Sequence, residues 1–459
     1  MPIHLDVGPR LVTPLAADRP AAARAALAEL DGRTVAWFRV DGTSGDGATE
    51  AEVVERAFAM AGEVGCPVVG LVHAVSVSPH AGGVAGLAAW GRVAKRAVDL
   101  SGVVPILLAV TGPCHGGLAP LLGLADHVVV TRDATAYING PRSVAATTGL
   151  HLTPDDLGGS AVHDAAGLAA WVAADEEDAM AALAELLSYL PDNHLAEAVV
   201  VPSTDPVDRR CIDGPAAVPE RSSESYDVRR VVTDVCDRGS LLEMRAGFAA
   251  NIITAYARID GRPVAVVANQ PWVRAGTLDI DASVKAARHV QAADAANLPI
   301  VTFVDTPGYE PGRDLEWRGM IRHGAKLVYA YGEATVPRVC VILRKSYGGA
   351  YIVMDSRTLG SDVVFAWPQA EIAVMGASGA VAILQRRAIA RADDPLAERL
   401  RLEEEYRTTY CTPRIAAERG YVDQVIDPPD TRVHVAAALA RLHHKRVPQP
   451  RRRHANGPL

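Results

Sequence analysis

The sequence lacks the patterns that mark membrane and secreted proteins. None of its apolar runs reaches the length of about 20 residues that crosses a bilayer, because Gly, Pro, His or Asp interrupts each one. The N-terminus has no basic segment followed by an apolar stretch, so nothing there is typical of a secretory signal. We therefore expect a cytoplasmic protein that has no membrane as a partner.

The short motifs of several enzyme classes are also missing. The chain contains no G-x-x-x-x-G-K-[ST] loop, no G-x-G-x-x-G opening a helix after a strand, no H-E-x-x-H and no G-x-S-x-G. Nucleotide hydrolysis, hydride transfer, zinc hydrolysis and serine hydrolysis therefore have no support. Chemistry that depends on backbone amides remains open.

Cysteines are few, and acidic residues outnumber basic ones. The six cysteines have no C-x-x-C spacing, which gives neither a zinc site nor a disulfide framework, and we expect no metal in this chain. The formal charge of −8 and the pI near 6.0 argue against nucleic acid as a partner. Cys114 stands beside a Gly-Gly pair and is conceivable as a nucleophile. The favoured interpretation is a small buried filler.

One pattern occurs twice in the chain. Residues Val103 to Val130 and Val336 to Phe365 each read as an apolar strand, a Gly-Gly pair, a helix, a short polar step and a second apolar strand. Such a repeat predicts two related α/β domains. The length of 459 residues accommodates two domains of about 200 residues each.

The two pairs are Gly116-Gly117 and Gly348-Gly349, and each stands where a strand passes into the first turn of a helix. Backbone N–H groups at a helix start have no intrahelical acceptor, so they suit the negative oxygen of an enolate or oxyanion. Glycine also permits tight turns and close packing, which is the alternative interpretation. Recurrence of the pair in both repeats favours the oxyanion interpretation.

The pattern of apolar and turn residues gives a domain plan. Alternating strands and helices predict mostly parallel sheets with ligand sites at the loops that follow strand ends. The predicted parts are an N-terminal segment (1–33, with a helix from Arg19 to Leu30), an N-terminal domain (34–201), a linker (202–227) and a C-terminal domain (228–459). The predicted strands are Thr34 to Val40, Val68 to Val72, Val104 to Val110, Ile253 to Ile259, Arg262 to Ala268, Ile300 to Val304, Val339 to Leu343 and Val363 to Trp367. The predicted helices include Ala48 to Val64, Val84 to Ser101, Glu177 to Tyr189, Pro395 to Thr408 and Thr431 to His443.

The second half of the chain carries further candidate site residues. Asp305 ends an apolar strand and is a candidate general base, although an Asp before Thr-Pro-Gly is at least as typical of a turn. His323 opens a helix, where a structural role is favoured over a catalytic one. Gly379 and Ala380 lie at another junction of strand and helix, and they offer consecutive amides.

Several of these segments carry a family resemblance. The chain resembles the carboxyltransferase (beta) subunit of biotin-dependent acyl-CoA carboxylases, of the propionyl-CoA and acetyl-CoA type, nearly from end to end. The similarity is closest from Gly261 onward and includes VDTPGYEPG, IRHGAKLVYAY, RKSYGGAY and AWPQAEIAVMGASGAV. In the first half, GPCHGG and LGGSAVH also fit. The resemblance implies two tandem crotonase-like (ClpP/crotonase) domains of the α/β class.

The resemblance also implies a reaction and its partners. A carboxyltransferase of this family moves CO2 from carboxybiotin to the α-carbon of an acyl-CoA through an enolate, and no side-chain base is strictly required. The usual assembly is a hexamer in which the N-terminal domain of one subunit meets the C-terminal domain of another. No lysine here lies in an Ala-Met-Lys-Met-like context and no ATP-binding signature is present. Carboxybiotin would therefore come from a separate biotin carboxyl carrier charged by a biotin carboxylase.

Site residues follow from the matching motifs. Gly116 and Gly117 would supply one oxyanion pair, Gly379 and Ala380 the other, with the sequence leaving open which oxygen each holds. Ala382 stands where the family tunes the choice of acyl chain, and its small apolar side chain hints at a changed pocket. The remaining residues expected to bind substrate are His73, Pro307, Gly308, Tyr347, Gly348 and Gly349.

The chain departs from the family mainly in the first domain. The family's glycine-rich loop D-G-A-G-A-R is replaced by His73 to Ser78, which loses the glycines and a candidate phosphate-binding Arg. A carboxyltransferase with an altered thioester substrate is the first hypothesis. The alternatives are a repurposed enzyme that decarboxylates or otherwise processes an acyl substrate without biotin, and a non-catalytic carboxylase subunit.

Overall fold

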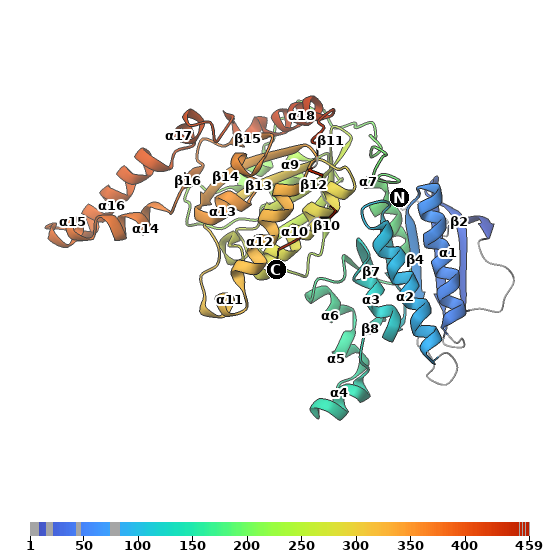
Figure 1. Ribbon diagram of the computed structural model, residues 1–459. Coiled ribbons are helices and arrows are strands. Elements are labelled where there is room, and N and C mark those ends of the chain that lie inside the picture. The colour runs from blue at the N-terminus through green and yellow to red at the C-terminus, as the bar shows by residue number, and fades with distance from the viewer. Residues whose placement is uncertain are drawn as a thin grey trace. The chain divides into compact units, whose positions relative to one another are not determined.

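The computed structural model describes residues 9–14, 22–42, 47–73, 83–448, 450–451, 453–454 and 456–458, and its helices and strands are shown in Figure 1. The chain forms two compact units. Unit 1 comprises Met1–Val199, Arg245–Phe248 and Ala295–Asn297. Unit 2 comprises Val200–Met244, Ala249–Asp294 and Leu298–Leu459.

Unit 1 is built on a seven-stranded sheet with the order β1-β2-β3-β4-β5-β7-β9. β1, β2 and β3 pair antiparallel, and the strands from β3 to β9 pair in parallel. β6 and β8 form a separate parallel pair. The strands are β1 (Arg10–Pro14), β2 (Ala23–Leu30), β3 (Arg33–Asp41), β4 (Val68–His73), β5 (Ile106–Val110), β6 (Pro113–His115), β7 (His127–Thr131), β8 (Thr135–Tyr137) and β9 (Trp171–Ala173).

The predicted helix from Arg19 to Leu30 is wrong in its described part, which is strand β2. β2 forms a hairpin with β3 through Asp31 and Gly32, whose φ angles are +50° and +74°. An Asp-Gly pair with two positive φ angles is the typical two-residue hairpin turn, since its twist matches that of the strands. The helix propensity of the alanines is thus overridden by pairing with β3. Unit 2 repeats the turn at Asp260 and Gly261, with φ angles of +53° and +73°.

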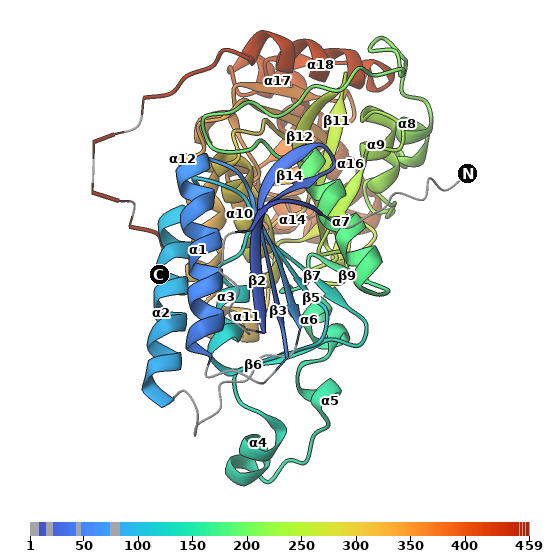
Figure 2. The same ribbon diagram turned by 90° about the vertical axis from the view of Figure 1, so that its right-hand side faces the viewer.

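Helices cover both faces of the unit 1 sheet. Figure 2 shows α1 (Ala48–Val64) and α2 (Gly83–Leu100) side by side on one face and α7 (Glu176–Tyr189) on the other. Alternate residues of each central strand pack into the α1 and α2 core, such as Phe38 and Leu108. The shorter elements are η1 (Gly116–Leu118), α3 (Ala119–Leu122), α4 (Pro141–Thr148), α5 (Pro154–Gly158) and α6 (Ser160–Ala165).

Unit 2 repeats the same topology. Its sheet has the order β10-β11-β12-β13-β14-β15-β17, and β16 pairs with β14 off this path. β10 to β12 pair antiparallel and the following strands pair in parallel, as in unit 1. The strands are β10 (Leu242–Met244), β11 (Ile252–Ile259), β12 (Arg262–Asn269), β13 (Ile300–Thr306), β14 (Arg338–Tyr347), β15 (Val363–Ala366), β16 (Glu371–Ala373) and β17 (Gln424–Val425).

The helices of unit 2 complete its core and one projecting arm. α9 and α18 pack with β11 to β15 around the buried Trp367, whereas α14, α15 and α16 extend away from the sheet as a hairpin (Figure 1). The helices are α8 (Asp213–Ala217), α9 (Arg229–Val235), α10 (Ile280–Ala295), α11 (Arg313–Trp317), α12 (Met320–Glu333), α13 (Gly348–Val353), α14 (Ala377–Leu384), α15 (Arg386–Arg391), α16 (Pro395–Tyr406), α17 (Pro413–Glu418) and α18 (Thr431–Leu442). The other strands and helices predicted above are confirmed to within a few residues at their ends.

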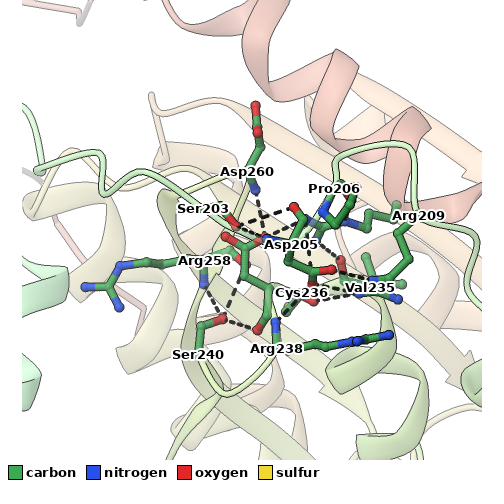
Figure 3. Close-up of polar contacts among 12 residues, drawn as sticks. Ser203, Asp205, Pro206, Arg209, Val235, Cys236, Arg238, Ser240, Arg258 and Asp260 are labelled. Atoms are coloured by element: carbon green, nitrogen blue, oxygen red, sulfur yellow. Dashed lines mark hydrogen bonds and ion pairs between the residues drawn. The ribbon is translucent and has the colours of Figure 1, made fainter.

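The stretch predicted as a linker, 202–227, folds as part of unit 2. Asp205 accepts hydrogen bonds from Arg209 Nε at 2.7 Å and from the Arg238 amide at 3.1 Å, within the polar cluster of Figure 3. The wholly buried Arg432 side chain of α18 donates to the Asp205 carbonyl at 3.1 Å and to Asp237 Oδ1 at 2.6 Å. These charge-assisted bonds fasten the stretch to the sheet and to the last helix.

Candidate active site: two repeated amide turns

The Gly-Gly turn of unit 2 lies where β14 passes into α13. Tyr347 ends the strand in an extended conformation (φ −116°, ψ 147°), and Gly348 follows at φ +57°. A side chain at this φ would be strained, so the turn needs glycine. The turn aims the first amides of α13 away from intrahelical acceptors, which is the property expected of an oxyanion site.

Unit 1 contains the same turn after β6. His115 is extended (φ −126°, ψ 154°) and Gly116 follows at φ +70°, where η1 begins. In both units, therefore, an extended residue is followed by a glycine of positive φ that opens a helical turn. Gly117 is the second residue of η1, so its amide too lies in the first turn of a helix.

A second helix start lies beside the Gly348 turn in unit 2. β16 pairs in parallel with β14, and Gly376 then caps α14 in an extended conformation. The loops touch: a Cβ on Gly348 would lie 3.2 Å from the Val374 carbonyl oxygen, and one on Gly376 would lie 3.0 Å from the Tyr347 ring. Unit 2 thus brings Tyr347 and Gly348 next to the start of α14.

The two predicted amides at the start of α14 differ. The Ala380 N–H donates to the Gly376 carbonyl at 3.1 Å, within the helix. Gly379 is the third helical residue, is exposed and precedes the first residue with an intrahelical acceptor. Its N–H is the more available donor of the pair. Ala382 lies one turn further along the same exposed side of α14.

Pro307 and Gly308, which the sequence predicts to bind substrate, directly follow β13. The loop that they begin lies beside the Gly348-Gly349 turn. The next residue is Tyr309, whose ring lies 3.3 Å from where a Cβ on Gly349 would be. Burial raises the pKa of Tyr309 to about 12, so its hydroxyl stays protonated at neutral pH. Tyr309 was not among the residues predicted from the sequence. Its position depends on a contact across about forty residues, which no local pattern encodes.

Asp305 does not have the surroundings of a general base. Its carboxylate is fully buried and accepts hydrogen bonds from Arg344 Nε at 2.9 Å and from the Lys345 amide at 3.2 Å. Burial raises the pKa of Asp305, and the neighbouring Arg344 and Lys345 charges act in the opposite direction. Asp305 lies within β13 and joins the end of that strand to β14, so its role is structural, but it is not the local turn residue expected from the sequence.

Arg344 and Lys345 also tie a distant stretch to this place. Arg344 donates to the carbonyls of Arg221 and Glu224 at 3.0 and 2.8 Å, and Lys345 Nζ donates to the Ser222 carbonyl at 3.0 Å. Residues 221–226 therefore strap the ends of β13 and β14, directly before the Gly348 turn. The charge-assisted hydrogen bonds of Arg344 and Lys345 therefore stabilise the strand end directly before the Gly348 turn.

His323 lies on α12, where its Nε2 accepts a hydrogen bond from Arg322 Nη2 at 3.1 Å. Partial burial, together with the charges of Lys326 and Arg322, lowers the pKa of His323. The contact is with a neighbour on the same helix, which fits the structural interpretation rather than a catalytic one.

His73 ends β4 in unit 1 and lies beside the strand that leads to Gly116. Its Nδ1 is 3.0 Å from the Thr111 carbonyl oxygen, and a Cβ on Gly112 would lie 2.5 Å from the same nitrogen. Thr111 and Gly112 directly precede β6. The replaced loop that follows His73, Ala74 to Ser78, lies outside the described residues.

Cys114 is fully buried within β6, and burial raises the pKa of its thiol to about 12. A thiolate is the reactive form, so Cys114 is not suited to be a nucleophile at neutral pH. The interpretation as a buried filler is confirmed. All six cysteines are free and buried.

The comparisons with known proteins identify the family. A family model described as the carboxyl transferase domain matches residues 25–456. The chain belongs to the carboxyl transferase family.

This carboxyltransferase is 45% identical over 447 residues to the propionyl-CoA carboxylase beta chain of Saccharopolyspora erythraea, with 94% of this chain and 82% of that protein covered. It is 40% identical over 435 residues to the methylmalonyl-CoA decarboxylase subunit alpha of Propionigenium modestum, with 94% and 84% covered. A crystal structure of transcarboxylase 12S, a hexamer with methylmalonyl-coenzyme A and methylmalonic acid bound, matches it with a TM-score of 0.90 and 41% identity over 95% of this chain and 85% of that one. The expected α/β class with tandem crotonase-like domains is confirmed by this likeness.

In the part of the carboxyltransferase that the structure describes, no helix is both long and apolar enough to span a bilayer. Among the same residues, no group of three or more His, Cys, Asp or Glu side chains is arranged to hold a metal ion.

Proposed function

We propose that this carboxyltransferase moves a carboxyl group from carboxybiotin, carried by a separate protein, to the α-carbon of an acyl-CoA thioester. Its relatives include a propionyl-CoA carboxylase beta chain, and a transcarboxylase of the same fold binds methylmalonyl-CoA. The observation that carries the proposal is that each unit offers amides at a helix start: those of the Gly116 turn in unit 1, and those at the start of α14, beside the Gly348 turn, in unit 2.

The chain's own part in the reaction is to hold negative oxygen. Taking the α-proton of an acyl-CoA places charge on the thioester oxygen, and amides that are already oriented stabilise this enolate without reorganisation. Gly116 and Gly117 supply donors in unit 1, and Gly379 supplies the principal donor in unit 2. The Ala380 N–H already donates to the Gly376 carbonyl, so it is only a shared donor in the second site.

The donor set fits a neutral ureido group as well as a thioester. Carboxybiotin, when bound, supplies the CO2 and the ureido oxygen that takes the α-proton. A ureido carbonyl is an acceptor, and backbone amides at a helix start are donors aimed at acceptors. Asp305, the carboxylate considered as a base, accepts a hydrogen bond from Arg344, which is consistent with a reaction that uses no side-chain base.

The same geometry supports the proposed substrate-binding residues. In unit 2, Pro307 and Gly308 directly precede Tyr309, whose ring lies at Gly349, and Tyr347 ends β14 directly before Gly348. Ala382, on the exposed side of α14, borders the acyl chain. In unit 1, His73 lies beside the strand that ends in the Gly116 turn.

The proposed partners are a biotin carboxylase and a biotin carboxyl carrier, together with further copies of this chain in a homo-hexamer. Transcarboxylase 12S is a hexamer of the same fold, which supports this assembly. A cytoplasmic location is retained as a prediction from the sequence.

Decarboxylation is the second candidate, because a methylmalonyl-CoA decarboxylase subunit alpha is 40% identical to this chain. A decarboxylase would use the same enolate but would protonate it rather than carboxylate it. The altered loop after His73 is the feature of this sequence that distinguishes it from the acyl-CoA carboxylases it resembles.

The forward reaction tests the proposal. The purified chain is mixed with a biotin carboxylase, a biotinylated carrier, ATP, 13C-bicarbonate and a panel of acyl-CoA esters, and the products are followed by mass spectrometry. We expect 13C in one or more acyl-CoA esters only when the chain is present. Absence of label from every ester, in a mixture where a propionyl-CoA carboxylase beta chain does give product, would overturn the proposal.

A further inference from the structure

The residues directly before Gly116 and Gly348 are His115 and Tyr347, and the side chain of each contacts a neighbouring strand. In unit 1, β6 and β8 pair in parallel with His115 opposite Tyr137. His115 Nε2 lies 3.3 Å from Thr135 Oγ1, the side chain of the first residue of β8. The His115 ring also stacks on Tyr137, with centroids 4.0 Å apart and planes inclined by 13°.

Unit 2 repeats this contact between the residue before the glycine and a paired strand, with different residues. β14 and β16 pair in parallel with Tyr347 opposite Ala373. The Tyr347 hydroxyl donates a hydrogen bond to Glu371 Oε2, on the first residue of β16. In both units, the residue before the glycine reaches back along the paired strand to its first residue.

Such a fastening is useful because the turn itself has little support. Among the residues that the structure describes, no atom lies within 4 Å of where a Cβ on Gly116 would be, so no described side chain packs on that side of the turn. Small displacements of a donor from the developing negative oxygen weaken its stabilisation steeply. A side chain anchored one residue before the glycine fixes the direction in which the chain enters the turn.

The imidazole is suited to the task in its neutral form. Burial lowers the pKa of His115, so the ring is neutral at neutral pH. A neutral ring stacks on an aromatic face and exchanges one hydrogen bond with a hydroxyl.

We propose that His115 is a positioning residue for the Gly116 and Gly117 amides, acting through Thr135 and Tyr137 as Tyr347 acts through Glu371 in unit 2. This inference rests on the proposed role of those amides in carboxyl transfer. It assigns to His115 an effect on the rate of the chemical step, because the residue orients donors whose interactions strengthen in the transition state.

Two conservative variants of the full chain and their combination test the proposal. His115→Phe keeps the ring on Tyr137 but loses the hydrogen bond, and Thr135→Val keeps the shape of the side chain but loses the hydroxyl. Tyr137→Phe is the matched control, because it keeps the stacked ring and leaves the bond between His115 and Thr135 intact. Two readouts are used: kcat and KM in carboxyl transfer, and hydrogen exchange of the amides in the peptide that spans residues 115–122.

We expect His115→Phe and Thr135→Val each to lower kcat about tenfold with little change in KM, and the double variant to be no worse than either. Exchange in the 115–122 peptide should accelerate in all three variants, whereas the peptide that spans Gly348 should be unchanged. Unaltered exchange in the 115–122 peptide, or effects on kcat that multiply in the double variant, would overturn the proposal.

The exchange readout separates this inference from the proposed function. If the wild-type chain transfers no carboxyl group, the proposed function fails. Faster exchange in the three variants would then still establish that His115 holds the turn, and unchanged exchange would refute it.

Discussion

Arg344 Nε donates to Asp305 Oδ2 at 2.9 Å, with the two side chains 2% and 0% exposed. The pair joins the ends of β13 and β14, so it couples the loop at Pro307 to the turn at Gly348. Removal of one partner leaves an uncompensated buried charge, which typically costs about 3–5 kcal/mol.

We therefore expect Asp305→Ala to lower the free energy of unfolding by about that amount and to reduce carboxyl transfer. Arg344→Met in the same chain should restore part of the stability, because no buried charge is then left alone. Urea unfolding of the two single variants and the double variant measures the coupling. A double variant as unstable as the sum of the singles would contradict a direct ion pair.

The amide of Gly379 can be removed without removing a helical hydrogen bond. Proline is tolerated in the first turn of a helix and lacks the N–H, so Gly379→Pro deletes the proposed donor. We expect kcat to fall by about 10²–10³, the usual cost of one oxyanion donor. Gly379→Ala is the control, because it keeps the N–H and, among the described residues, the nearest atom to its Cβ would be Met375 Sδ at 4.0 Å. Equal losses in both variants would show that shape rather than the amide is at stake.

Cys114 should be dispensable for chemistry. Its buried thiol, with a pKa near 12, is neither exposed nor ionised at neutral pH. We expect Cys114→Ala to retain carboxyl transfer within about twofold and to lose about 1 kcal/mol of stability from the small cavity. Steady-state kinetics and thermal unfolding measure the two effects. A loss of activity comparable to that of Gly379→Pro, in a protein that remains folded, would indicate that Cys114 takes part in the reaction as a nucleophile.

Asp355 should make stability depend on pH. The side chain is wholly buried, and burial raises its pKa from 3.8 to about 6, with Arg338 at 3.1 Å acting in the opposite direction. Between those pH values the folded protein binds the proton more tightly than the unfolded chain. The contribution of Asp355 to stability therefore falls as the pH rises through this window, and it is lowest above pH 6.

Comparison with Asp355→Asn isolates this effect, because the amide does not titrate. As the pH falls from 6 to 4, the wild type should gain stability relative to the variant, with a slope that approaches about 1.4 kcal/mol per pH unit. Urea unfolding of both proteins at several pH values checks this. A constant difference between them would exclude the raised pKa.

Ala382 should influence the choice of acyl chain. It lies on the exposed side of α14, one turn after Gly379. A carboxylate placed there has to be desolvated against a long apolar chain, so Ala382→Asp should lower kcat/KM for longer acyl-CoA esters more than for shorter ones. The expected change in the ratio is about tenfold, since one methylene is worth about 1–3 kcal/mol. Ala382→Ser is the smaller control, and an unchanged ratio in both variants would place the acyl chain elsewhere.

Much of the architecture could be predicted from the sequence, because strand periodicity and helix boundaries are local signals. Gly116 and Gly348 were found in this way, and both have the positive φ that their place in the pattern indicates. The hairpin at Asp31 and Gly32 was predictable from the same kind of signal, but the alanines of β2 are typical of a helix. Local propensity failed there because the pairing partner decides the conformation of an Ala-rich strand.

The supporting contacts could not be predicted in this way. Arg344 meets Asp305 across 39 residues of sequence and Glu224 across 120. The bond between His115 and Thr135 depends on the register of two short strands. Such contacts arise from the packing of distant segments, and a single sequence does not encode them as a spacing.

The biotin dependence of the reverse reaction tests the central claim most directly. The purified chain is incubated with methylmalonyl-CoA or malonyl-CoA, with and without free biotin, and the loss of the carboxyl group is followed by mass spectrometry. The account predicts loss that requires biotin and that is slower by about 10²–10³ in Gly379→Pro but retained in Gly379→Ala. Loss that proceeds equally well without biotin would contradict carboxyl transfer and establish the decarboxylase instead.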